Sequence, residues 1–191
     1  MSEFENKLID QFNMMPDYSI TALFVDTDQY FPAITNTLFY TTEQREMGGG
    51  YVTITRPARA IMNKLLAQKI RIADTYFIDC ISYMVGGASM ASKQVVNLES
   101  PTMLETVLLK VDWAFRQIAA PQKFLFLDSV NALGIYNRDK ILKEFLHVFI
   151  NRLRARDIFS IMLVVGRGLP RDLEEILQMT CDETVDLRKK V

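Results

Sequence analysis

Residues 123–131, KFLFLDSVN, constrain the fold more than any other part of the sequence. Residues 124–127 are apolar on both faces, which is typical of a central strand in a parallel sheet that is covered on both sides. Asp128 and Ser129 follow at the carboxyl end of this strand, where open α/β sheets bind their ligands. An Asp in this position can also serve only to cap a turn. The segment alone leaves a binding site and a structural cap equally open.

Apolar runs and amphipathic segments alternate along the whole chain. We expect strands at residues 19–25, 51–55, 75–80, 124–127, 158–165 and 183–187, the last at a sheet edge. We expect helices at residues 2–15, 30–47, 57–69, 101–118, 140–156 and 170–179. Gly48, Gly49 and Gly50 are expected to end a helix and form a turn, and residues 83–97 to be mainly loop. This alternation predicts an α/β domain over residues 1–191, with residues 1–17 as a mostly helical extension.

The composition argues against several classes of protein. A chain of 191 residues with a net charge of −1 fits one domain and has no basic field that would favour nucleic acid or an anionic membrane. Cys80 and Cys181 form no CxxC pair, so we expect neither a zinc site nor a disulfide framework, as is usual in a reducing cytoplasm. No apolar run reaches the roughly 18 residues of a membrane span. The first residues also lack the apolar core of a signal peptide.

The helix predicted at residues 140–156 carries the one His of the chain and a basic end. We expect His147 to be packed in or beside the core, because no second metal-ligating residue lies near it in sequence. Arg152, Arg154 and Arg156 are expected to be cations near a helix C-terminus. A contact with DNA is the less favoured interpretation of these three residues.

Residues 26–33, DTDQYFPA, follow the first predicted strand, where many nucleotide-binding α/β proteins have a phosphate-binding loop. Such a loop, GxxxxGK[ST], needs glycines so that backbone N–H groups can approach phosphate, and a lysine to offset its charge. This stretch has neither residue type. Asp26 and Asp28 would instead repel a triphosphate. Their alternative role is to cap the following helix and favour its positive end.

The order of these segments resembles the RecA/KaiC-like family of P-loop ATPases, including its archaeal KaiC-related members. KFLFLDSVNAL resembles the Walker B strand, YVTIT the second strand and TYFIDCIS the third. NLESPTMLETVLLKVDWAF resembles the segment that leads into the helix before Walker B, and IFSIMLVVGRG the strand that usually precedes a sensor residue. The match extends over about residues 20–187. It implies a RecA-like three-layer fold with a mainly parallel sheet and helices on both faces.

The resemblance carries over to the catalytic positions only in part. Asp128 matches the Walker B Asp, which holds magnesium in active members. The catalytic Glu of the family falls at about Thr55, with Arg56 beside it, and the phosphate-binding loop is missing. The resemblance therefore implies an inactivated, non-catalytic pseudo-ATPase without an ATP or magnesium cofactor.

Such a protein is expected to act as a cytoplasmic regulatory or scaffolding subunit, in processes such as signal transduction. The resemblance implies a protein partner, either a second copy of the chain or an active RecA/KaiC-like paralogue. Any ligand in the former nucleotide cleft would be lined by Asp26, Thr27, Asp28, Gln29, Asp128 and Ser129.

Two other functions are considered. One is a nucleotide sensor that binds without hydrolysis. The other is a magnesium-dependent phosphatase of the haloacid-dehalogenase type, with Asp26 as nucleophile and Asp28 as general acid. That class also needs a later acidic pair at a strand end, and Asp182 with Glu183 is the candidate pair after the fifth strand. This pair precedes a strand, which argues against the phosphatase.

Overall fold

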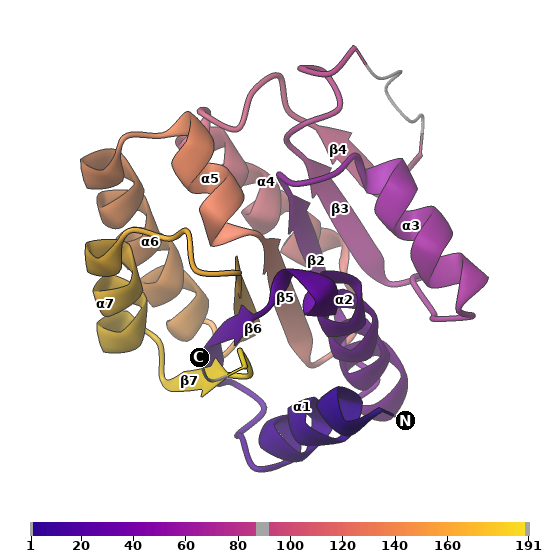
Figure 1. Cartoon of the computed structure of the whole chain (residues 1–191). Coiled ribbons are helices and arrows are strands. Elements are labelled where there is room, and N and C mark those ends of the chain that lie inside the picture. Colours follow the sequence, from indigo (N-terminus) through magenta and orange to yellow (C-terminus); the bar gives the residue numbers. More distant parts are fainter. Residues whose placement is uncertain (1, 87–91, 190–191) are drawn as a thin grey trace.

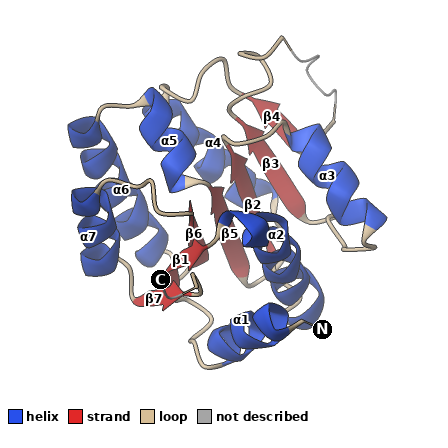
Figure 2. Ribbon diagram, in the orientation of Figure 1, coloured by secondary structure: helices blue, strands red, loops and turns tan. Residues whose placement is uncertain are grey.

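The computed structural model describes residues 2–86 and 92–189, which form a sheet with helices on both faces (Figures 1 and 2). Within these residues the seven strands are β1 Ile20–Val25, β2 Gly48–Thr53, β3 Thr75–Asp79, β4 Val95–Asn97, β5 Lys123–Asp128, β6 Phe159–Val165 and β7 Glu183–Asp186. Their order is β4-β3-β2-β5-β6-β1-β7 and every neighbouring pair is parallel. The sheet and its layers confirm the predicted α/β three-layer RecA-like fold.

The helices divide into two groups according to the face of the sheet that they cover (Figure 2). One face packs against α1 Glu3–Asn13, α2 Tyr30–Phe39 and α3 Ala58–Ala67. The other face packs against α4 Leu104–Gln117, α5 Val130–Tyr136, α6 Asp139–Arg154 and α7 Arg171–Thr180. The central strand β5 is buried on both sides, as its apolar sequence predicts.

The N-terminal segment packs tightly onto the domain. Ser2 caps α1 in a reciprocal arrangement with Glu5. Phe12 is fully buried, and its backbone carbonyl accepts a hydrogen bond from the Tyr40 hydroxyl at 2.9 Å. The predicted helix in this segment is confirmed, and it contributes Phe12 to the core.

The prediction that Gly48, Gly49 and Gly50 end a helix is wrong. The α-helix α2 ends at Phe39, and a π-helical turn, Tyr40–Gln44, follows it directly. The three glycines are the first residues of β2. A Cβ atom on Gly49 would lie 2.4 Å from the backbone oxygen of Phe124 in the neighbouring strand. Glycine therefore allows β2 and β5 to approach closely, and a run of glycines in the sequence does not by itself reveal this role.

Three further differences concern short or partly exposed elements. Residues 95–97, expected as loop, form β4 at the sheet edge, and α5 was not predicted because seven residues carry too little periodicity. Leu66 in α3 and Ile141 and Val148 in α6 are exposed, although each lies in the apolar stripe expected from the periodicity of its helix. Within the described residues no helix is both long and apolar enough to cross a bilayer.

Candidate functional site

The carboxyl ends of β1, β2, β5 and β6 meet at one edge of the sheet, because these strands run parallel. Asp128, the last residue of β5, pairs in register with Thr53 of β2. Thr55 and Arg56 follow β2, and residues 26–29 follow β1. The residues singled out in the sequence thus reach the same edge from three different strands.

Asp128 lies at this edge but has no exposed surface. Its Oδ2 atom accepts hydrogen bonds from the hydroxyls of Tyr30 at 2.6 Å and Tyr51 at 2.7 Å. Its Oδ1 atom has no hydrogen-bond partner among the described residues. Burial raises the pKa of Asp128 above its ordinary value of 3.8, although both hydroxyls and the Arg56 cation oppose the shift.

The two tyrosines reach Asp128 from different elements. Tyr30 is the first residue of α2, while Tyr51 lies within β2 and stacks on Phe126 with ring centroids 5.1 Å apart. Burial, followed by the charge of Asp128, raises the pKa of both hydroxyls well above the ordinary value. Both tyrosines therefore remain protonated donors at any physiological pH.

The loop after β1 forms a 3-10 turn at Thr27–Gln29. Asp26 accepts a hydrogen bond from the backbone N–H of Lys189 at 2.8 Å, and Asp28 forms an ion pair with the Lys189 ammonium at 2.9 Å. Neither the turn nor α2 receives a side-chain cap. The interpretation of Asp26 and Asp28 as helix caps is therefore wrong, because both carboxylates bind Lys189 instead.

A hollow of about 400 Å³, here named the apolar pocket, opens between this loop and α5. Its apolar walls are Tyr30, Phe31, Ala132, Ile135 and Val165. Its polar lining residues are Thr27, Asp28, Thr55, Arg56, Ser129 and Asn131. Of the six residues predicted for the cleft, Thr27, Asp28 and Ser129 line this pocket.

A second hollow, here named the acidic groove, lies on the other side of the same loop and measures about 880 Å³. It is lined by Asp26, Asp28, Gln29, the start of α1 and residues 186–189. Asp26 and Gln29 border only this groove, whereas Asp28 borders both hollows. The structure therefore divides the six predicted residues between two hollows and the buried Asp128.

Ser129 is joined to Asp128 by a cis peptide bond and begins the short helix α5. Its hydroxyl accepts a hydrogen bond from the backbone N–H of Ala132 at 3.3 Å and lies 3.4 Å from the Thr55 hydroxyl. Asn131, in the first turn of α5, accepts a hydrogen bond from the backbone N–H of Val165 at 2.8 Å. These contacts fix the pocket walls formed by α5 and β6.

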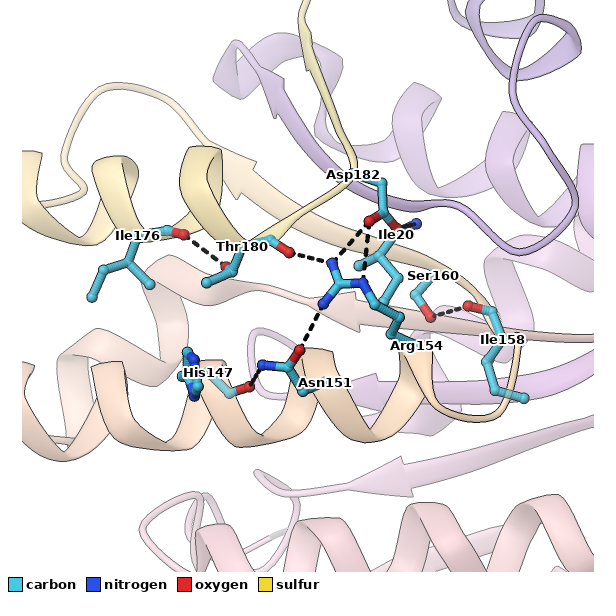
Figure 3. A network of polar contacts seen from close by, with 9 residues as sticks. All are labelled: Ile20, His147, Asn151, Arg154, Ile158, Ser160, Ile176, Thr180 and Asp182. Atoms are coloured by element: carbon cyan, nitrogen blue, oxygen red, sulfur yellow. Dashed lines mark hydrogen bonds and ion pairs between the residues drawn. The ribbon is translucent and has the colours of Figure 1, made fainter.

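Asp182, the candidate second acidic residue of a phosphatase, lies far from Asp26. Its side chain accepts a hydrogen bond from the backbone N–H of Ile20, the first residue of β1, at 2.9 Å (Figure 3). Asp26 follows the last residue of the same strand, so the two carboxylates flank opposite ends of β1. Among the described residues no group of three or more Asp, Glu, His or Cys side chains could hold a metal ion.

The basic end of α6 is held by acidic residues. Arg154 bonds to Asp182 and to the carbonyl of Thr180 (Figure 3), while Arg152 and Arg156 both form ion pairs with Asp112. These contacts support the interpretation of the three arginines as structural cations. The prediction that His147 is packed in or beside the core is wrong, because its side chain is exposed on α6.

Sequence reasoning missed several residues that shape the site. Tyr51 was assigned only to a strand, and Arg56 was noted only as the neighbour of the missing glutamate. Asn131 was included in the central stretch without a role. A polar tyrosine within a fully buried strand is the one signal that could have marked Tyr51, because a buried hydroxyl needs a hydrogen-bond partner.

Comparisons with known proteins give the class of the fold. No protein-family model matches the chain, and no curated protein matches it in sequence. A KaiC-like protein from the hyperthermophilic archaeon Pyrococcus horikoshii OT3 has a similar structure, with a TM-score of 0.65 and 15% identity, over 92% of this chain and 74% of that one. An uncharacterized protein from Pyrococcus horikoshii, solved with an unknown peptide, gives a TM-score of 0.64 and 11% identity, over 96% and 83%. The fold is therefore RecA-like and similar to that of KaiC-like proteins.

The residues at this edge do not fit ATP and magnesium, the group that a RecA-like fold commonly binds. Residues 26–33 offer neither a glycine nor a lysine, and Asp26 and Asp28 place negative charge where phosphates would lie. Asp128 has no exposed oxygen to offer a metal ion.

Proposed function

We propose that this protein is an inactivated RecA/KaiC-like pseudo-ATPase that acts as a regulatory or scaffolding subunit in the cytoplasm. The observation that carries the proposal is the hydrogen bond of 2.6 Å from the Tyr30 hydroxyl to Asp128. Tyr30 belongs to the stretch that replaces the phosphate-binding loop of the family. A residue of the replacing stretch is thus hydrogen-bonded to the carboxylate that corresponds to Walker B.

The arrangement around Asp128 opposes metal binding. A magnesium ion is usually bound by one or two accessible carboxylates and by several water molecules. Here Oδ2 already accepts two hydroxyl hydrogen bonds, the carboxylate is fully buried, and its raised pKa disfavours the ionised form. A metal ion could reach the remaining oxygen, Oδ1, only if the residues that bury Asp128 moved apart.

The position of the general base supports the same proposal. Thr55 occupies the place that corresponds to the catalytic Glu, and its hydroxyl lies 3.4 Å from that of Ser129. A threonine hydroxyl does not accept a proton from water near neutral pH, so it cannot replace a carboxylate base. Arg56 beside it is a permanent cation.

The proposed role depends on association with a protein partner. Exposed apolar side chains remain on the helices that cover one face of the sheet, among them Leu109, Ile135 and Ile141. A second copy of the chain or a RecA/KaiC-like paralogue would cover such surface. This part of the proposal rests on the resemblance together with these exposed side chains.

Calorimetric titration of the purified protein with ATP and magnesium, with released phosphate measured on the same sample, tests the loss of activity. We expect neither heat of binding nor phosphate, while an active RecA-like ATPase run in parallel gives both. Binding without phosphate release would favour the nucleotide sensor. Phosphate release that survives an Asp128→Asn substitution would point to another site, and release that is lost would overturn the proposal.

Sedimentation velocity over a wide range of protein concentrations tests association. We expect either a self-associated species or a complex when an active RecA/KaiC-like paralogue is added. A protein that stays monomeric at every concentration and forms no complex with such a paralogue would contradict the scaffolding role.

A further inference from the structure

We infer that the apolar pocket binds a small organic monocarboxylate with a flat apolar body. The pocket measures about 400 Å³, and most of the surface that lines it is apolar, although polar residues also contribute to the lining. Sites for small molecules typically have about 300–1,000 Å³ and this same composition. This inference goes beyond the proposed function, since it assigns a ligand to a protein proposed to have lost its nucleotide.

Arg56 supplies the group that recognises the anion. Its guanidinium lies over the Phe31 ring, 5.0 Å from the centroid, and 5.9 Å from the centroid of Tyr30. Among the described residues the guanidinium has no hydrogen-bond or ion-pair partner, although the side chain lines the pocket. Stacking on aromatic rings restrains the planar guanidinium while its N–H groups remain available. A carboxylate matches these donors in a bidentate pair.

The walls select a flat apolar body. Phe31 and Tyr30 form an edge-to-face pair with centroids 5.0 Å apart on one side of the pocket. Ile135 on α5 is 76% exposed and Val165 ends β6, so both offer apolar surface to a ligand. A planar apolar group placed between these walls would remove this surface from water.

The charges of the pocket limit the ligand to one negative charge. Arg56 is the one cation among the lining residues, and the Asp28 carboxylate lies on the same lining. A second or third negative charge would meet no further cation on this lining, where the Asp28 carboxylate, itself paired with Lys189, lies instead. The pocket therefore favours a monocarboxylate over a nucleoside triphosphate. The Thr55 and Ser129 hydroxyls, 3.4 Å apart, can bind a further polar atom of the ligand.

Methyl NMR of the isoleucine δ1 groups tests the inference, with the Ile135 signal assigned from an Ile135→Val variant. The probes are benzoate, phenylacetate, cinnamate and indole-3-acetate, and phenylacetamide serves as the uncharged match of phenylacetate. We expect at least one carboxylate to shift the Ile135 signal saturably. The amide should bind at least about tenfold more weakly, because it cannot form a charge-assisted bidentate pair.

Two substitutions separate recognition from general surface binding. Arg56→Gln should weaken binding of the best carboxylate at least about tenfold, through loss of hydrogen bonds to a charged group. Arg59→Gln, an exposed arginine of the next helix that does not line the pocket, should leave the affinity unchanged.

Certain results would overturn the inference. They are the absence of a saturable shift with all four carboxylates, equal affinity of the Arg56→Gln and Arg59→Gln variants, and equal binding of phenylacetamide. Each variant is checked for folding by the positions of its remaining methyl signals. Binding or hydrolysis of ATP in the calorimetric experiment would contradict the proposed function. It would not contradict the carboxylate site, which the methyl NMR experiment tests separately.

Discussion

Two buried carboxylates, Asp79 and Asp128, end the strands on either side of β2 and are held in different ways. Asp79 uses both oxygens. Its Oδ1 accepts hydrogen bonds from the backbone N–H groups of Ile81 and Ser82, at 3.0 and 2.9 Å. Its Oδ2 accepts from the backbone N–H of Ala58 and from the Ser82 hydroxyl, both at 2.7 Å. Asp79 thus fixes the turn after β3 and the start of α3.

Within residues 2–86 and 92–189, the Asp128 side chain hydrogen-bonds no backbone group. One oxygen accepts hydrogen bonds from two tyrosine hydroxyls, and the other has no partner among the described residues. The difference teaches that burial alone does not make a carboxylate structural. A buried carboxylate that accepts hydrogen bonds from several backbone N–H groups stabilises the fold, whereas one that accepts none contributes little to stability.

The largest loss of stability is expected when Asp79, the carboxylate that accepts four hydrogen bonds, is replaced. Asp79→Ala leaves three backbone N–H groups and one hydroxyl without their acceptor, in a region closed to water. We expect the free energy of unfolding to fall by about 3 kcal/mol or more. Urea unfolding followed by circular dichroism measures this change. Asp74→Ala, at an exposed position, is the matched control and should have no comparable effect. Equal midpoints for the two variants would remove the structural role of Asp79.

An intermediate effect is expected from removing one donor of Asp128. Tyr51→Phe deletes a hydroxyl that hydrogen-bonds a buried carboxylate, so we expect a loss of about 2 kcal/mol of unfolding free energy at neutral pH. The loss should shrink when the same substitution is made in an Asp128→Asn background, because the acceptor is then uncharged. A double-mutant cycle measures this coupling. Additive losses would show that the Tyr51 hydroxyl stabilises the protein independently of Asp128. Tyr18→Phe, at an exposed site, is the control.

The smallest effect is expected for Asp128→Asn. The amide oxygen can accept from both tyrosines, and the amide nitrogen replaces an oxygen that already lacks a partner. The variant also removes a buried charge, so its unfolding free energy at pH 7 should equal or exceed that of the wild type, within about 1 kcal/mol. A destabilisation as large as that of Asp79→Ala would make Asp128 structural as well.

The pH dependence sharpens this last comparison. Because the pKa of Asp128 is raised in the folded state, its contribution to stability is fully present below pH 3.8 and is lost as the pH rises through the raised value. Asp128→Asn should lack this loss, so its stability relative to the wild type should increase with pH. Asp28→Asn should show the opposite trend, because the hydrogen bond with Lys189 lowers the pKa of Asp28. Parallel pH profiles for the wild type and Asp128→Asn would contradict the raised pKa.

Much of the fold could be predicted because long elements carry clear periodicity. The alternation of apolar runs with amphipathic segments gave the parallel sheet, and the apolar residues 124–127 gave its central strand. The glycines of β2 misled the prediction because Gly commonly marks a turn, whereas here Gly49 permits contact with Phe124. Short elements such as α5 lie below the length at which periodicity is informative.

The site was less predictable because it is formed by contacts across the chain. Asp128 was recognised from its position at a strand end. Its partners Tyr30 and Tyr51 are 98 and 77 positions away in sequence, so no local pattern connects them to it. Arg56 can be recognised only once two things are known: the pocket that it lines, and its lack of an ion-pair partner in the part of the chain that the structure describes.

The position of β1 in the sheet has a consequence for how the protein is made. Both neighbours of β1 come from late in the chain, since Ile20 pairs with Ser160 of β6 and Thr21 with Glu183 of β7. During synthesis this fully buried and largely apolar strand emerges early, and it has no strand partner until most of the chain has followed. Such a delay leaves an unpaired apolar strand exposed, which favours aggregation and slows folding. We therefore expect newly synthesised chains to need chaperones until β1 has paired with β6 and β7.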